Sequence, residues 1–168
     1  MTYARFEDLP VWKEAIRLAN GVYNMTESRD WKGSHSLRDQ IERAALSVSN
    51  NIAEGFERGT TNELLMFLYI ARGSAGEVRS MLCFIERRKA FVHFKSQISN
   101  LKSVAESCSR QLRAWADHLQ NSEIKGQRHL TKRSKQQYDA GQSAAEFEKE
   151  LLETLPPDHP MRKFKLGE

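Results

Sequence analysis

The sequence has few of the residues that interrupt a helix. Its four prolines stand at position 10 and among the last thirteen residues, and only nine of the 168 residues are glycine. Proline removes a backbone hydrogen-bond donor, and glycine costs about 1 kcal/mol in a helix interior relative to alanine. Residues 11–155, which contain no proline, therefore favour long helices.

Disulfides, membrane spans and a signal peptide are also missing. Cys83 and Cys108 are too few for a disulfide framework, which indicates a reducing compartment. The longest apolar run, Leu64 to Ala71, is far shorter than the roughly 20 residues of a membrane span. The first eight residues lack the basic and apolar regions of a signal peptide. We expect a cytoplasmic protein with no membrane partner.

Motifs for catalysis and metal binding are absent as well. A di-iron bundle needs Glu-x-x-His pairs, and none of the five histidines has an acid three residues before it. The two cysteines lack the spacing of a zinc site, and no glycine-rich phosphate loop or nucleophile elbow occurs. We expect no enzymatic activity, no metal and no cofactor.

Charge is the first feature that points to a partner. The formal net charge is +4, and the sequence isoelectric point is about 9.1. Five basic residues and no acid lie in 124–138, whereas six acids and one lysine follow in 139–158. Such blocks are typical of flexible or interacting segments. We predict a bundle domain over 1–121, a basic flexible linker over 122–141, and a short acidic amphipathic helix with a tail over 142–168.

Apolar residues recur at intervals of three and four in four segments, which is the spacing of one helix face. The first segment starts at Asp8, with Pro10 in its first turn. The second starts near Ser36, a candidate N-cap, and the third opens at Thr60 and Glu63 with the form of a capping box. These signals predict where three helices begin.

The third and fourth segments carry the most regular pattern. The apolar line of the third is Leu64, Leu68, Ala71, Ala75, Val78, Leu82 and Ile85. That of the fourth is Phe94, Ile98, Leu101, Ala105, Cys108, Leu112, Trp115 and Leu119. A sustained repeat of about 3.5 residues is typical of helices packed at small angles, and a short connection makes them antiparallel neighbours. We predict an all-α fold, an antiparallel up-down four-helix bundle.

The third segment is broader in its apolar character than a single bundle needs. Residues 64–71 are apolar on every side, whereas about three apolar positions in seven are enough for one buried face. We expect this surface to pack on another copy, which makes the protein a homo-oligomer; the alternative is cover by the N-terminal segment or the tail. The predicted interface comprises Leu65, Met66, Phe67, Ile70, Ser74, Glu77, Met81 and Phe84.

Polar residues also stand beside the apolar lines. Asn50, Asn51 and Glu54 flank the core line of the second segment, and we predict a structural polar layer there, with a ligand site as the alternative. Gly73 and Gly76 lie in the middle of the third segment. Close approach of another backbone would offset their cost.

Basic residues of the third and fourth segments and of the region after them could contact nucleic-acid phosphates. The alternative is a solvated helix face with pairs such as Arg38 and Glu42 at a spacing of four. The candidate nucleic-acid-binding residues are Arg72, Arg79, Arg87, Arg88, Lys89, Lys95, Lys102, Arg110, Arg113, Lys125, Arg128, Lys132, Arg133 and Lys135.

Three motifs are characteristic in combination: FEDLPVW at 6–12, SVSNNIAEGF at 47–56 and FLYIARGSAGE at 67–77. Together they resemble the bacterial four helix bundle protein family, also called the rRNA intervening-sequence protein family because some members are encoded inside large-subunit rRNA genes. The resemblance covers roughly residues 4–120 and implies a bundle that assembles as a ring-like homopentamer without an established enzymatic activity. The accessory variability determinant of diversity-generating retroelements is similar in fold, and it binds RNA and a reverse transcriptase.

Charge and resemblance together favour a non-catalytic oligomeric bundle that binds RNA or a ribonucleoprotein through basic surfaces. The alternative is a protein-interaction scaffold or accessory subunit for another polypeptide, such as a reverse transcriptase, without direct contact to nucleic acid.

Overall fold

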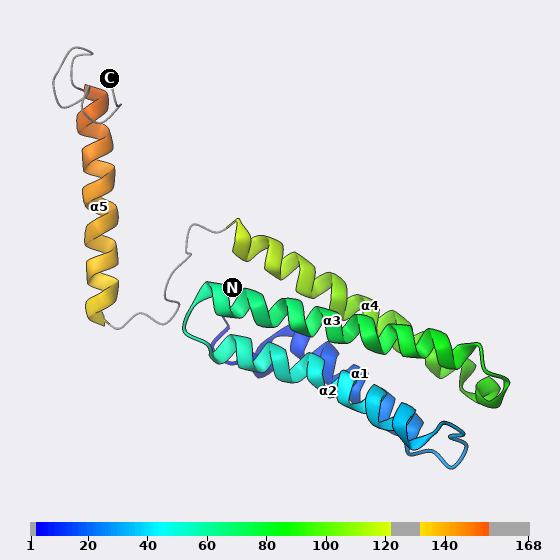
Figure 1. Ribbon diagram of the computed structural model, residues 1–168. Helices are drawn as coiled ribbons and strands as arrows, with labels where there is room; N and C mark the ends of the chain where they lie inside the picture. Colours follow the sequence, from blue (N-terminus) through cyan, green and yellow to red (C-terminus); the bar gives the residue numbers. More distant parts are fainter. Residues whose placement is uncertain (1–2, 122–131, 155–168) are drawn as a thin grey trace. The chain divides into compact units, whose positions relative to one another are not determined.

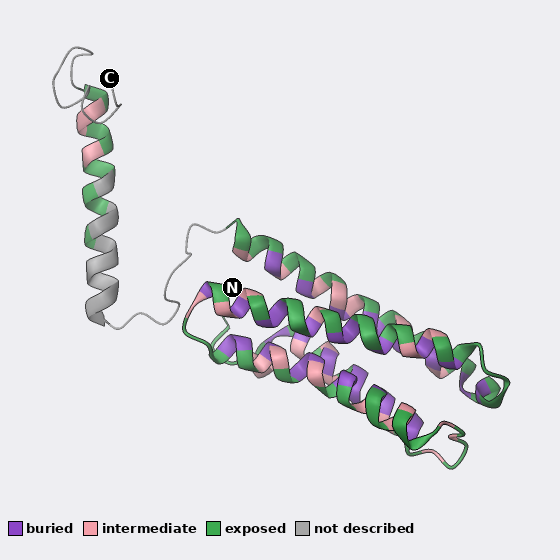
Figure 2. Cartoon of the chain, in the orientation of Figure 1, coloured by how far each residue is buried: buried purple, intermediate pink, exposed green. Residues whose placement is uncertain are grey.

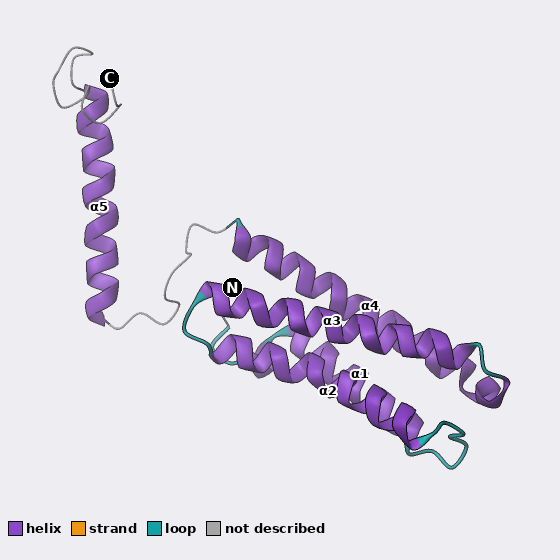
Figure 3. Ribbon diagram, in the orientation of Figure 1, coloured by secondary structure: helices purple, strands orange, loops and turns teal. Residues whose placement is uncertain are grey.

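The computed structural model describes residues 3–121 and 132–154, and every element in these ranges is helical (Figures 1 and 3). None of the described helices combines the length and the apolar character needed to cross a bilayer. The elements are η1 (Phe6–Asp8), α1 (Pro10–Thr26), α2 (His35–Glu57), α3 (Thr61–Glu86), η2 (Lys89–Phe94), α4 (Lys95–Gln120) and α5 (Lys132–Thr154).

Local chemistry determines where the helices begin. Pro10 occupies the first turn of α1, where its missing N–H would have no partner in any case. The expected cap at Ser36 is wrong, because Ser34 is the N-cap of α2 and its Oγ accepts the Leu37 N–H at 3.3 Å. The N-cap of the expected capping box at the start of α3 is confirmed, since Thr60 Oγ1 accepts the Glu63 N–H at 3.2 Å.

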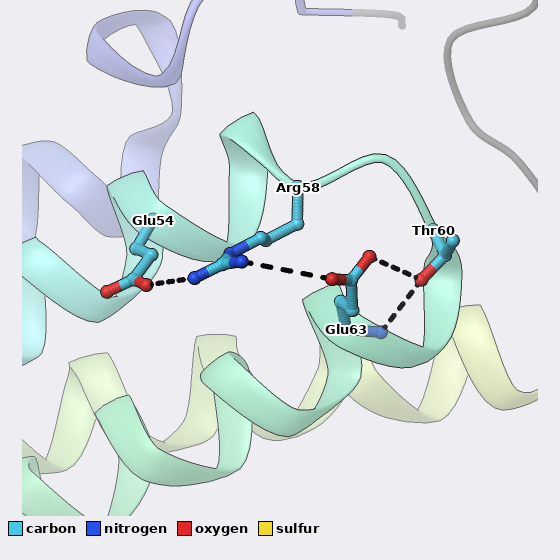
Figure 4. Close-up of polar contacts among 4 residues, drawn as sticks. All are labelled: Glu54, Arg58, Thr60 and Glu63. Carbon is cyan, nitrogen blue, oxygen red and sulfur yellow. Dashed lines mark hydrogen bonds and ion pairs between the residues drawn. The ribbon is translucent and has the colours of Figure 1, made fainter.

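The turn between α2 and α3 carries a chain of charged contacts (Figure 4). Thr60 Oγ1 donates to Glu63 Oε2 at 2.8 Å, and Arg58 pairs with Glu54 and lies 3.9 Å from Glu63. All four side chains are at least partly exposed, so solvent screens the ion pairs and each contributes little to stability. The contacts link the end of α2 to the first turn of α3.

Helices α1 to α4 form an up-down bundle, in which each helix packs against the next and α1 packs against α4 (Figure 1). The predicted apolar line of α3 is buried throughout, and the line of α4 is buried from Phe94 to Leu112 (Figure 2). The bundle is therefore confirmed as the fold of this part of the chain. Its largest fully buried side chains include Leu18, Ile41, Leu68, Leu82, Ile98 and Leu112.

Helix α5 belongs to a second unit, separate from the bundle. It begins at Lys132, so residues 132–141 are helical where the sequence predicted a linker. A block of basic charge disfavours burial but not helical backbone, and lysine, arginine and glutamine are good helix formers. Within α5 the Phe147 side chain is 66% exposed. The expected features at 122–131 and 155–168 lie outside the described residues.

Both cysteines are free, and burial distinguishes them. Cys108 has no exposed surface, and burial raises the pKa of its thiol to about 12. At pH 8 only about one such thiol in 10⁴ is ionised, and the thiolate is the reactive form. Cys83 is partly exposed.

We expect Ellman's reagent to label one thiol per chain in the native protein and two after denaturation, and Cys83→Ser to abolish the native signal. Rapid native labelling of Cys83→Ser would contradict this assignment.

Candidate nucleic-acid interface

Four of the predicted cationic residues meet where α3 turns into α4. Arg87, Arg88, Lys89 and Lys95 are all exposed and surround an open hollow of about 190 Å³, here called the turn hollow. Its full lining is Glu86, Arg87, Arg88, Lys89, Phe91, Val92, Lys95 and Ile98. Positive charge concentrated around a concave surface attracts anions more strongly than the same charge spread over a helix.

Two buried rings anchor the segment that carries these cations. Phe91 and Phe94 are buried, three residues apart, and the residues between them are exposed. This is the spacing of one face of a 3₁₀ turn, so the two rings anchor η2 against the bundle. The Arg87 guanidinium donates to the carbonyl of Cys83 at the C-terminus of α3, where a positive charge is favourable.

Glu86 is the one acidic residue of the turn hollow, and it is paired. Lys102 Nζ donates to Glu86 Oε2 at 2.8 Å. This hydrogen bond holds the pKa of Glu86 below its usual range and raises the pKa of Lys102. Both residues of the pair stay charged at neutral pH, so the positive charge of Lys102 offsets the negative charge of the Glu86 carboxylate. Lys102, a candidate phosphate contact in the sequence, is thus paired with a carboxylate in the structure.

A second hollow adjoins the first at the same end of the bundle, where the α1–α2 loop lies (Figure 1). This loop hollow has a volume of about 370 Å³, and it shares Arg88 and Phe91 with the turn hollow. Trp31 holds the loop in place, because its ring packs edge-on against Phe91 with centroids 4.9 Å apart. The lining is Lys32, Gly33, Ser34, Ser36, Leu37, Gln40, Phe84, Arg88 and Phe91.

Lys32 is the cation that sequence reasoning missed. It lies in a loop, where no periodicity indicates which way a side chain points. The long-range contact between Trp31 and Phe91 brings the loop to this end of the bundle, where Lys32 lines the loop hollow together with Arg88. The structure thus forms one surface from Lys32, Arg87, Arg88, Lys89 and Lys95, here called the cationic end.

The remaining basic candidates are not part of this surface. Arg110 and Arg113 lie about 22 Å or more along α4 from Lys95. They pair within their helix, with Glu106 at 3.4 Å and Asp117 at 3.5 Å. The anticipated pair of Arg38 with Glu42 is also present, at 2.8 Å. These contacts fit solvated helix faces.

Other candidates lie elsewhere. Arg72 and Arg79 are on α3, half-buried and exposed respectively. Lys132, Arg133 and Lys135 belong to α5, in the other unit, and Lys125 and Arg128 lie outside the described residues.

The predicted interface between copies divides into two parts. Met66, Ile70, Glu77 and Phe84 are exposed, and Leu65 and Met81 are half-buried. Phe67 and Ser74 are buried inside the single chain, at 9% and 8% exposure, which corrects their assignment to an outer face. Both face α2. Gly55 of α2 allows the close approach of Phe67 Cβ, and Ser74 Oγ lies 2.9 Å from Ser47 Oγ.

The polar layer predicted on α2 differs in its members from the one in the structure. Asn50 and Glu54 are exposed, so neither belongs to a buried layer. Asn51 is half-buried and donates to the carbonyl and hydroxyl oxygens of Ser47, at 2.7 and 2.9 Å. The half-buried polar contact between α2 and α3 at this level thus includes Asn51, Ser47 and Ser74. Hydrogen bonds satisfy it internally, which leaves no indication of a ligand site.

The sequence matches the family described as 23S rRNA-intervening sequence protein over residues 7–114, well over half of the chain. No curated protein matches it. Among solved structures, the fold is similar to a protein of unknown function from the S23 ribosomal protein family of Bacteroides thetaiotaomicron VPI-5482, with a TM-score of 0.56 and 17% identity. That match covers 63% of this chain and 97% of the other. The chain belongs to the 23S rRNA-intervening sequence protein family.

Proposed function

We propose that this protein is a non-catalytic RNA-binding bundle that contacts phosphates through the cationic end. The observation that carries the proposal is the grouping of five exposed cations, from two segments distant in sequence, around adjoining hollows. The one acid among their linings, Glu86, is already paired with Lys102. Such a surface binds phosphate backbones, with an affinity that falls steeply with salt.

Assembly into a homo-oligomer would strengthen this binding. Met66 and Ile70 are 52% and 44% exposed on one face of α3, beside Gly73 and Gly76, at which an added Cβ would meet nothing within 4 Å in the single chain. A second copy packed on this face would cover the apolar side chains at close approach. In a ring of five, as the family resemblance implies, the net charge of +4 per chain would total about +20.

Filter binding of the full chain to a structured RNA at 50 and 200 mM salt tests the proposal. If about four phosphates are contacted, the affinity should fall roughly 50-fold between these concentrations where the contacted segment is single-stranded and roughly 150-fold where it is a duplex. Absence of binding at 50 mM salt would remove the proposal and favour a scaffold for another polypeptide.

Reversing three charges of the cationic end, as Arg87→Glu, Arg88→Glu and Lys89→Glu together, should weaken RNA binding at 50 mM salt by roughly 50-fold or more. The same change in total charge made elsewhere, at Arg17, Arg110 and Arg113, is the matched control, because each of these pairs within its own helix. An equal loss in both variants would mean that total charge governs binding and that the cationic end does not.

A further inference from the structure

We infer that the cationic end binds RNA as a single strand, with one unstacked base in the loop hollow against Phe84 and the neighbouring phosphates on the cations of the turn hollow. This inference rests on the proposed function and names the form of RNA that the site takes.

Phe84 is an unusual side chain for this position. It is 52% exposed near the end of α3, and the Arg88 guanidinium carbon lies 5.7 Å from its ring centroid. Proteins that bind single-stranded RNA place bases on aromatic rings and on the planes of arginine guanidinium groups. The combination of an exposed ring and an adjacent arginine supplies both kinds of stacking surface.

The loop hollow has the size and lining for a base. Its volume of about 370 Å³ is at the lower end of the roughly 300–1,000 Å³ found for pockets that hold small ligands. Leu37 and Phe91 contribute apolar surface. The Ser36 hydroxyl, which bonds Ser34 at 3.0 Å, and the Gln40 amide, whose nitrogen donates to Glu77 at 3.4 Å, keep further donor and acceptor capacity for a base edge. The lining contains no acidic residue, and the Glu77 carboxylate beside it is hydrogen-bonded to Gln40.

The two hollows are arranged for consecutive parts of one strand. Arg88 and Phe91 line both, so a base in the loop hollow lies next to the cations Arg87, Lys89 and Lys95 around the other. A duplex does not fit this arrangement, because its bases are stacked and paired inside the helix and present mainly phosphates and 2′-hydroxyls. A single strand can place a base and its phosphates in the two hollows at once.

The test is fluorescence anisotropy of the full chain with a labelled 12-nucleotide unstructured RNA and with a 12-base-pair RNA duplex, at equal salt. The single strand should bind at least tenfold more tightly. Phe84→Ala should weaken single-strand binding about tenfold, within the range measured for loss of one stacked base, and leave duplex binding and the salt slope unchanged. Phe84→Trp keeps a stacking ring and should restore binding.

Leu46→Ala is the matched control. Leu46 is also an exposed apolar side chain, at 37% exposure, but it lies on α2 and lines neither hollow. A strand carrying 2-aminopurine adds a direct readout, because its fluorescence is quenched when the base stacks. Quenching should survive in Leu46→Ala and be lost in Phe84→Ala.

Three outcomes would overturn the inference. Equal binding of strand and duplex, with Phe84→Ala unchanged, would leave the RNA-binding proposal intact and remove the stacking site. A change in subunit number in Phe84→Ala, measured by mass photometry, would assign Phe84 to an interface between copies. Absence of RNA binding at 50 mM salt would remove the proposed function and the inference together.

Discussion

Phe67→Ala should lower the free energy of unfolding by about 3–4 kcal/mol, which corresponds to a melting temperature about 10 °C lower. The ring is 9% exposed between α2 and α3, and the Arg58 guanidinium carbon lies 5.2 Å from its centroid. Truncation leaves a cavity and removes this cation–π contact. Urea unfolding followed by circular dichroism, at fixed protomer concentration, measures the loss.

Phe84→Ala is the matched comparison, because it removes the same ring from the same helix at a site that is 52% exposed. We expect it to cost less than about 1 kcal/mol. Equal losses in the two variants would contradict the assignment of Phe67 to the core. So would a Phe67→Ala protein that unfolds like the parent but no longer assembles.

This pair shows what periodicity can and cannot predict. The interval of three and four residues correctly locates the core line of α3, because a helix has one face directed at its neighbours. It does not separate Phe67 from Ile70, which lies about 60° further round the helix and is 44% exposed. Coverage of Phe67 depends on Gly55 opposite, and only the pairing of α2 with α3 reveals that contact.

The helix N-caps also show which features were predictable from the sequence and which were not. The capping box was predictable because Thr60 and Glu63 need only each other. The cap of α2 was not, because Ser34 and Ser36 lie two residues apart and either could serve. Their hydroxyl oxygens lie 3.0 Å apart, and the packing of the preceding loop decides between them.

The candidate site shows the same division. Arg87, Arg88 and Lys89 are consecutive, so the sequence alone groups them. Lys32 joins them across 55 positions of sequence, through a contact between two aromatic rings. The charge of the site was therefore predictable from the sequence. Its concave shape and the exposure of the Phe84 ring were not, because both depend on how the helices and loops pack.

Gly55→Val should lower the free energy of unfolding by about 3 kcal/mol, near the upper limit for overpacked cores. A Cβ at position 55 would lie 2.7 Å from Phe67 Cβ and 3.2 Å from Leu64 Cδ1. Phe67 Cβ is fixed to the backbone of α3, so the two helices must separate. Replacing glycine in a helix would otherwise stabilise it by up to about 1 kcal/mol, and the steric cost exceeds this gain.

Gly73→Ala is the control with the opposite sign, because an added Cβ there meets nothing within 4 Å in the single chain. In the single chain, the free energy of unfolding should rise by up to about 1 kcal/mol, because alanine has a higher helix propensity than glycine. If a second copy packs against this face at close approach, the same methyl group weakens assembly, and the variant dissociates at a higher protomer concentration than the parent. Mass photometry over a dilution series together with urea unfolding separates the two effects. A gain in stability with unchanged assembly would mean that any contact between copies lies away from Gly73, since a methyl group in a close helix contact cannot be neutral.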